Sequence, residues 1–125
     1  MDTQDTVRHA TKERRRAVFE EAVNVIERKY ATDLDLDALA REIATSRRQL
    51  QRAFAEAGQT SFRNYLHGVR MERAAELLRE GSLRVWEVAE AVGYSQPAQF
   101  AKAFRRHHGH APSALHAAAN VNRAA

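Results

Sequence analysis

The 125-residue sequence predicts an all-α fold of about seven helices, in which a unit of two helices occurs twice. Only two prolines and five glycines interrupt the chain, and apolar residues recur at helical spacing. No stretch alternates apolar and polar residues as a half-buried strand would. A pattern of leucine, alanine and phenylalanine between residues 39 and 54 also returns, in similar form, between residues 88 and 104.

The helices are expected to begin and end at recognisable signals. Asp35 and Ser46 can act as N-caps, and Gly58 follows the third helix. Pro97 suits the first turn of the sixth helix, where its missing N–H has no helical partner. The expected ranges are Lys12–Tyr30, Leu36–Ala44, Arg47–Ala57, Phe62–Glu80, Val85–Val92, Gln96–His108 and Ser113–Ala119. The corresponding regions are a flexible N-terminal tail at 1–11, a first lobe at 12–59, a connecting helix at 60–81, a second lobe at 82–119 and a C-terminal tail at 120–125.

The internal repeat defines the two-helix unit. Ala40 and Ala89 hold matching positions, and the offset of 49 residues persists through Ser46 and Ser95. After the serines the offset is 50, so the second turn contains one extra residue. Each unit has a short apolar helix, a turn with a small residue, and a helix whose apolar stripe has i, i+4 spacing. This plan is typical of a helix-turn-helix, whose second helix enters the major groove of DNA.

The charge distribution points to a polyanionic partner. The net charge is +4, the pI is about 10.0, and no acidic residue follows Glu90. Arginine, lysine and glutamine on the free face of the second helix of each unit can donate hydrogen bonds to base edges. Base contacts are expected from Arg47, Arg48, Gln51, Arg52, Gln96, Ala98, Gln99 and Lys102. Phosphate contacts are expected from Ser46, Arg63, Ser95, Arg105, Arg106 and His107.

The predicted connecting helix, Phe62–Glu80, has a length that suits two DNA-binding units. Its 19 residues span about 28 Å at about 1.5 Å per residue. Successive major-groove faces lie about 34 Å apart. We therefore expect a monomer that binds an asymmetric site of about 20 base pairs, because the two units differ in sequence. Arg70 of this helix is expected to join a structural ion pair.

Other functions lack their motifs. The absence of cysteine excludes disulfides, cysteine-ligated zinc and thiol nucleophiles. The histidines at 107, 108 and 110 match no closed zinc site, and no glycine-rich phosphate loop or HExxH motif occurs. We therefore expect no enzyme, no cofactor and no metal. No apolar run approaches the roughly 18 residues of a membrane span, so no membrane association is expected.

Whole motifs of this sequence resemble the DNA-binding domain of the AraC/XylS family over residues 22–118. The motifs that carry the resemblance are Leu39-Ala40, Ser46, Leu50–Phe54, Ser61–Leu66, Arg70-Met71, Ala74, Leu77-Leu78, Val88–Ser95, Phe100, Lys102–Phe104, Gly109 and Pro112. The resemblance implies a transcription factor, most often an activator, that inserts two recognition helices into adjacent major grooves. The small size is similar to that of stand-alone MarA/SoxS-type regulators. By position, the base-contact residues that it implies are Arg48, Gln51, Arg52, Pro97, Ala98, Gln99 and Lys102.

The resemblance also implies a bacterial, cytoplasmic, DNA-associated protein whose partners are double-stranded DNA and RNA polymerase. Two alternatives remain open at this point. The chain could be a protein–protein adaptor that docks on RNA polymerase without DNA, or the DNA-binding half of a larger ligand-sensing regulator.

Overall fold

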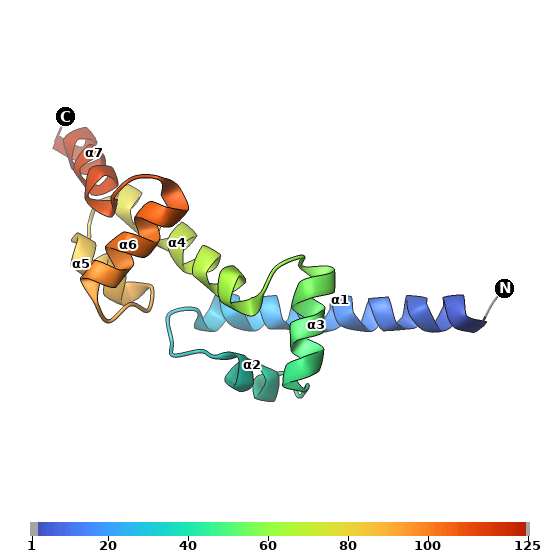
Figure 1. The fold of residues 1–125 in the computed structure, drawn as a ribbon. Helices are drawn as coiled ribbons and strands as arrows, with labels where there is room; N and C mark the ends of the chain where they lie inside the picture. Colours follow the sequence, from blue (N-terminus) through green and yellow to red (C-terminus); the bar gives the residue numbers. More distant parts are fainter. Residues whose placement is uncertain (1–2, 125) are drawn as a thin grey trace. The chain divides into compact units, whose positions relative to one another are not determined.

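The computed structural model describes residues 3–124, with side chains described through residue 121. This part of the chain contains seven α-helices and no strand, which confirms the all-α prediction (Figure 1). The helices are α1 Thr3–Lys29, α2 Leu36–Glu42, α3 Arg47–Ala57, α4 Phe62–Glu80, α5 Val85–Ala91, α6 Pro97–His108 and α7 Pro112–Ala124.

The two terminal helices are longer than the sequence predicts. α1 begins at Thr3 rather than Lys12, and α7 continues to Ala124 rather than ending at Ala119. Neither added segment contains a proline or glycine that would end a helix, and Asp5 in the first turn of α1 suits the positive end of the helix dipole. None of the described helices combines the length and the apolar composition needed to cross a membrane.

The chain forms two compact units. Unit 1 contains the described residues up to Lys29 together with Leu34–Leu66, and unit 2 contains Tyr30–Asp33 and the chain from His67 onward. Unit 1 therefore holds α1, α2 and α3, and unit 2 holds α5, α6 and α7. α4 contributes its first residues to unit 1 and the remainder to unit 2.

An aromatic cluster around Phe54 forms the centre of unit 1. The Phe54 ring is fully buried and makes edge-to-face contacts with Phe19 and Phe62, with centroids 5.3 and 6.0 Å apart. Gly58 allows this packing, because a Cβ there would lie 2.5 Å from the Phe19 ring. At the end of α3, Gln59 has a positive φ of 52°, whereas Gly58 keeps a right-handed conformation. Gly58 is thus needed for close packing of α1 on α3.

The core of unit 2 joins α4 to the second two-helix unit. Phe100 and Phe104 of α6 are fully buried and contact each other, with ring centroids 5.8 Å apart. The other buried members of this cluster are Met71, Ala74, Ala75, Leu78, Val88, Ala89 and Val92. The small side chains on α4 and α5 let these helices approach closely, so that α6 has a continuous apolar surface to pack on.

The turns of the two helix pairs make the same backbone hydrogen bonds. In the first turn, Ala44 N–H donates to Arg41 C=O at 3.2 Å, and Thr45 N–H donates to Ala40 C=O at 2.9 Å. The second turn repeats both bonds 49 residues later, at 3.1 and 2.9 Å. The residue after the C-cap is left-handed in each case, with φ 55° at Ala44 and 97° at Gly93. Both turns are therefore Schellman motifs, which confirms the repeat at atomic level.

Arg70 fixes the loop between α1 and α2 to unit 2. Its Nε donates to Tyr30 C=O at 2.8 Å, and its Nη2 donates to Thr32 C=O at 3.0 Å. Burial lowers the pKa of Arg70, while Tyr94 and Asp33 act in the opposite direction. The prediction of an ion pair for Arg70 is therefore wrong, because backbone carbonyls rather than a carboxylate accept its hydrogen bonds.

A pair of substitutions tests the turn geometry. Gly93→Ala is expected to lower the free energy of unfolding by at least about 1–2 kcal/mol, because the left-handed region is unfavourable for alanine. The new Cβ would also lie 3.2 Å from Ala31 O and 3.3 Å from the Arg70 guanidinium. Ala44→Gly relieves the strain of the left-handed conformation in unit 1, but glycine loses more conformational entropy on folding. The free energy of unfolding should therefore rise by only about 0–1 kcal/mol. Urea unfolding of both variants measures the difference, and equal losses would contradict the interpretation.

Arg70→Lys tests the attachment of the loop. The ammonium group of lysine cannot donate to both carbonyls as the guanidinium does, so the C=O of Tyr30 or of Thr32 loses its charge-assisted hydrogen bond. The expected loss is about 1.5–3 kcal/mol of unfolding free energy in thermal or urea denaturation. A loss below about 0.5 kcal/mol, the size of an ordinary surface substitution, would mean that the two hydrogen bonds do not hold the loop.

Candidate nucleic-acid interface

α3 is held in place by its cap and its buried stripe. The Ser46 hydroxyl oxygen accepts a hydrogen bond from Gln49 N–H at 3.1 Å, as the sequence predicts for an N-cap. Leu50, Ala53 and Phe54 have no solvent exposure. Since these residues occupy one side of α3, the opposite side is free to meet a partner.

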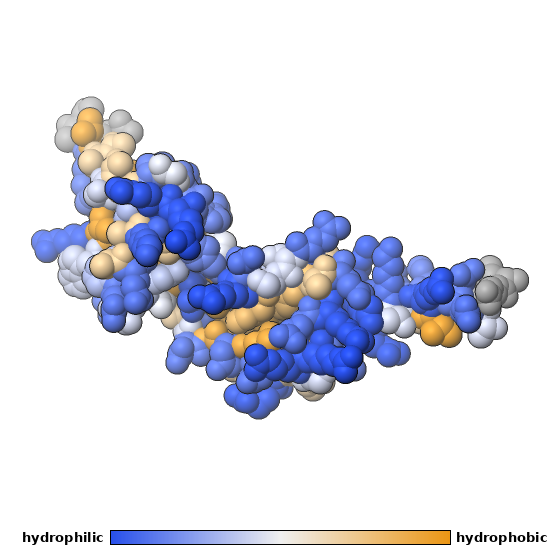
Figure 2. Space-filling view, in the orientation of Figure 1, coloured by the Kyte–Doolittle hydropathy of each residue, from blue (hydrophilic) through white to orange (hydrophobic). Residues whose placement is uncertain are grey.

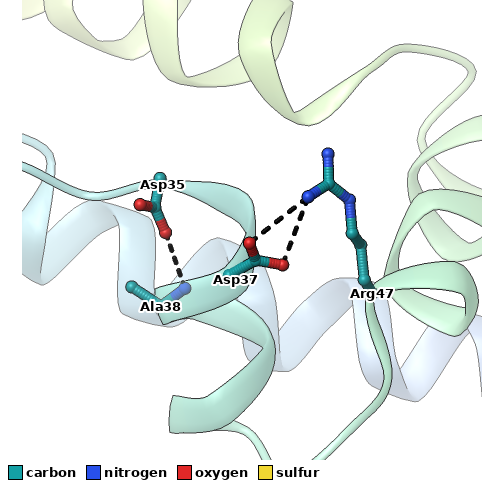
Figure 3. A network of polar contacts seen from close by, with 4 residues as sticks. All are labelled: Asp35, Asp37, Ala38 and Arg47. Carbon is teal, nitrogen blue, oxygen red and sulfur yellow. Dashed lines mark hydrogen bonds and ion pairs between the residues drawn. The ribbon is translucent and has the colours of Figure 1, made fainter.

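The base-contact residues predicted on α3 all lie on this free side or at its edge, and all are exposed: Arg47, Arg48, Gln51 and Arg52. Arg47 differs from the others because its Nη1 lies 3.3 and 3.4 Å from the two carboxylate oxygens of Asp37 (Figure 3). These two side chains are 60% and 54% exposed, so water weakens the ion pair. Among the described residues, the remaining three make no hydrogen bond or ion pair through their side chains. Their donors are available to a ligand.

α6 begins one residue later, relative to its turn, than α3 does. Gln96 is the N-cap residue but makes no capping bond with its side chain, and Pro97 is the first helical residue. Ser95 consequently does not hold the capping position that Ser46 holds in unit 1. The extra residue that the sequence repeat predicts thus lies between the turn and the helix.

This shift changes which residues of the two helices are equivalent. The positions on α6 that match the three unpaired residues of α3 are Ala98, Ala101 and Lys102. Gln99 instead matches Gln49, at the edge of the face. Sequence reasoning omitted Ala101, which is partly buried, although the offset of 50 after the serines would have identified it. The base-contact residues predicted on and beside α6 are all exposed, namely Gln96, Ala98, Gln99 and Lys102.

The predicted phosphate-contact residues are also all exposed: Ser46, Arg63, Ser95, Arg105, Arg106 and His107. His107 already has a partner, because its Nε2 lies 3.1 Å from Glu72 Oε1. Arg105 and Arg106 belong to the last turn of α6, where positive charge suits the helix dipole. The arginines of this set make no ion pair within the part of the chain that the structure describes.

One group of side chains in unit 2 could approach a metal ion. Glu72, His107 and His108 each offer a ligand atom, and these atoms lie within 4.8 Å of one another. The protein itself already provides contacts for these atoms, since His107 contacts Glu72 and His108 Nε2 lies 3.0 Å from Met71 O. Glu72 and His107 are also exposed to water. This grouping brings together two of the histidines that the sequence shows near the end of α6.

The chain is similar in sequence to known helix-turn-helix proteins. A family model described as a helix-turn-helix domain matches residues 39–118. The chain is 37% identical over 99 residues to the HTH-type transcriptional regulator GlxA of Rhizobium meliloti, which covers 79% of this chain and 29% of GlxA. The chain spans about a third of the length of the curated relatives it matches.

Two solved structures are similar over most of the chain. The C-terminal domain of AraT, a response regulator from Geobacillus stearothermophilus, has a TM-score of 0.77 at 31% identity, covering 81% of this chain and 84% of that chain. A transcriptional regulator from Chromobacterium violaceum, described among AraC-type DNA-binding domain-containing proteins, has a TM-score of 0.76 at 30% identity. That match covers 81% of this chain and 90% of the other.

Matched serine substitutions test the different starts of α3 and α6. Ser46→Ala removes the acceptor of the Gln49 N–H and should lower the free energy of unfolding by about 1 kcal/mol. Ser95→Ala removes no cap and should change it by less than about 0.5 kcal/mol. Thermal or urea unfolding of the two variants is the measurement. Equal effects would mean that the two serines have the same role in their turns.

Proposed function

The chain belongs to the AraC-type helix-turn-helix family, and we propose that it is a sequence-specific transcriptional regulator that binds double-stranded DNA. In this proposal α3 and α6 are recognition helices that enter two successive major grooves of one duplex. The observation that supports it best is the free face of α3, where exposed guanidinium and amide groups lie opposite a fully buried apolar stripe.

The chemistry of this face suits direct reading of bases. Arg48 and Arg52 can each donate two hydrogen bonds to guanine O6 and N7, and Gln51 can pair with adenine N6 and N7. Arg47 can join them by exchanging its solvent-exposed carboxylate partner, Asp37, for DNA, because that ion pair is weak. We therefore assign to α3 the larger part of base recognition.

α6 offers fewer donors on its equivalent face. Lys102 can donate to a guanine, while Ala98 can make an apolar contact with a thymine methyl group. Gln96 and Gln99 lie at the start of the helix and at the edge of its face, where they add adaptable polar contacts. Phosphate contacts from Arg63, Arg105 and Arg106 would then orient the two helices.

Binding to DNA in this mode predicts an asymmetric site for one copy of the chain. The two recognition helices differ in sequence, so no symmetry-related copy is needed to read about 20 base pairs. We place this activity in the bacterial cytoplasm, with RNA polymerase as the partner through which bound protein activates transcription. Affinity should fall as the salt concentration rises. A plot of log affinity against log salt concentration should have a slope of about −0.9 for each phosphate neutralised.

A second candidate is that the chain is the DNA-binding half of a larger ligand-sensing regulator. The observation that favours it is that the chain covers only about a third of its curated relatives. Both candidates require the same DNA contacts. They separate in a transcription assay, where a self-sufficient regulator changes promoter output when this chain alone is supplied, and the half of a larger protein binds without that effect.

Substitution of Arg52 tests sequence recognition. Arg52→Ala should weaken binding by about 1–3 kcal/mol and relax the preference at one base pair, because a bidentate base contact is lost. The measurement is selection of bound duplexes from random DNA by the wild type and the variant. Arg79→Ala, an exposed arginine in the last turn of α4, is the charge-matched control. If Arg52→Ala weakens binding equally to every sequence, Arg52 contacts phosphate instead.

A further inference from the structure

We infer that the N-terminal half of α1 extends the DNA interface of unit 1, with Arg14 binding a backbone phosphate beside the segment that α3 reads. This inference rests on the proposed function and adds a contact to it. It concerns a part of the chain that precedes the matched family region, residues 39–118. The ligand is the phosphodiester of the same duplex.

A small positively charged hollow lies between α1 and α3. Its volume is about 120 Å³, and its lining consists of Thr11, Arg14, Arg15, Val18, Gln49 and Arg52. Three arginines therefore border one hollow, and no acidic residue lines it. Like charges around one hollow repel one another, so an anion in the hollow is electrostatically favoured. Arginine is also the side chain best suited to bidentate binding of phosphate.

Only one of the three arginines is neutralised by the protein. Arg15 forms an ion pair with Glu56 of α3, which fixes α1 against the recognition helix. Arg14 and Arg52 make no hydrogen bond or ion pair among the described residues. The neighbouring acid, Glu13, does not line the hollow, and its carboxylate lies 3.9 Å from His9 on its own helix. The hollow therefore retains two uncompensated positive charges.

Positive charge continues along α1 beyond the hollow. A larger groove of about 580 Å³ is bordered by four cationic residues, Arg8, Lys12, Arg15 and Arg16, and by Glu56. Its single carboxylate, Glu56, is the one already paired with Arg15. Figure 2 shows hydrophilic side chains over part of α3 and of the adjoining α1, next to more apolar patches. A row of cations of this kind attracts the negatively charged phosphates of a nucleic-acid backbone.

The position of Arg52 identifies DNA as the occupant. Arg52 belongs to the face of α3 that we propose for base contacts, and it also borders the hollow. A phosphate bound by Arg14 in this hollow therefore lies beside Arg52, at the edge of the bases that α3 would read. The phosphates that flank a major groove run along its edges, and we place one of them in this hollow when α3 occupies the groove. An acidic protein segment would instead compete with the duplex for the same arginine.

The test uses the full chain and a duplex that the wild type selects from random DNA. Arg14→Ala should make the salt slope of binding shallower by about 0.9. The ratio of affinities at 50 and 200 mM salt should consequently fall about 3.5-fold. Ethylation interference should lose one phosphate at the edge of the site, while base protection remains. Arg14→Lys should restore most of the slope, because a phosphate contact needs charge more than a planar fork.

Arg28→Ala is the matched control, because it removes an exposed arginine from the same helix. Arg28 borders a different hollow that contains Glu21 and Glu42, so its removal should leave both the slope and the interference pattern unchanged. If Arg14→Ala behaves as Arg28→Ala does, the inference is wrong although the proposed function stands. If the wild type selects no duplex at all, the proposed function itself fails.

Discussion

The backbone turn between the two helices of each unit is the constraint on which the rest of the structure depends. A left-handed residue after the C-cap reverses the chain within two residues, so the second helix can place its apolar stripe on the first. Gly93 adopts this conformation with little strain, whereas Ala44 adopts it against the preference of an L-amino acid. The cost at Ala44 is offset by the buried contacts of α3, whose Leu50 and Phe54 are fully enclosed.

Identical turns nevertheless present different surfaces. The extra residue lies before α6, so equivalent positions of α3 and α6 differ by 50 in number, and Ala98 and Ala101 stand where α3 has Arg48 and Gln51. A helix rotates about 100° per residue, so one insertion changes the whole exposed face unless the helix start moves with it. Here the start does move, and the buried stripe is kept. The exposed side chains are what differ between the two helices. The face of α3 carries Arg47, Arg48 and Arg52, whereas the equivalent positions of α6 carry one cation, Lys102.

Much of the fold follows from local signals in the sequence. The bounds of α3 and α4 agree with prediction because caps, glycines and apolar spacing all point to the same residues. The length of α1 does not, because a polar segment such as Thr3–Thr11 has no stop signal and no apolar stripe, and its state depends on context. The sequence likewise predicts only part of the candidate DNA interface. Exposure of Arg48 and Arg52 follows from helical periodicity, but the Arg47–Asp37 ion pair joins two helices and has no signature in spacing.

The sequence by itself determined most of the helices, the repeat and the exposed faces of α3 and α6, because these depend on periodicity and capping over a few residues. Only the tertiary structure decided what Arg15, Gly58 and Arg70 do. Arg15 pairs with Glu56, Gly58 admits the Phe19 ring, and Arg70 binds two loop carbonyls. Each of these contacts joins residues about 40 positions apart in the chain. Such pairings arise from how packed helices bring their surfaces together, which no local pattern of residues records.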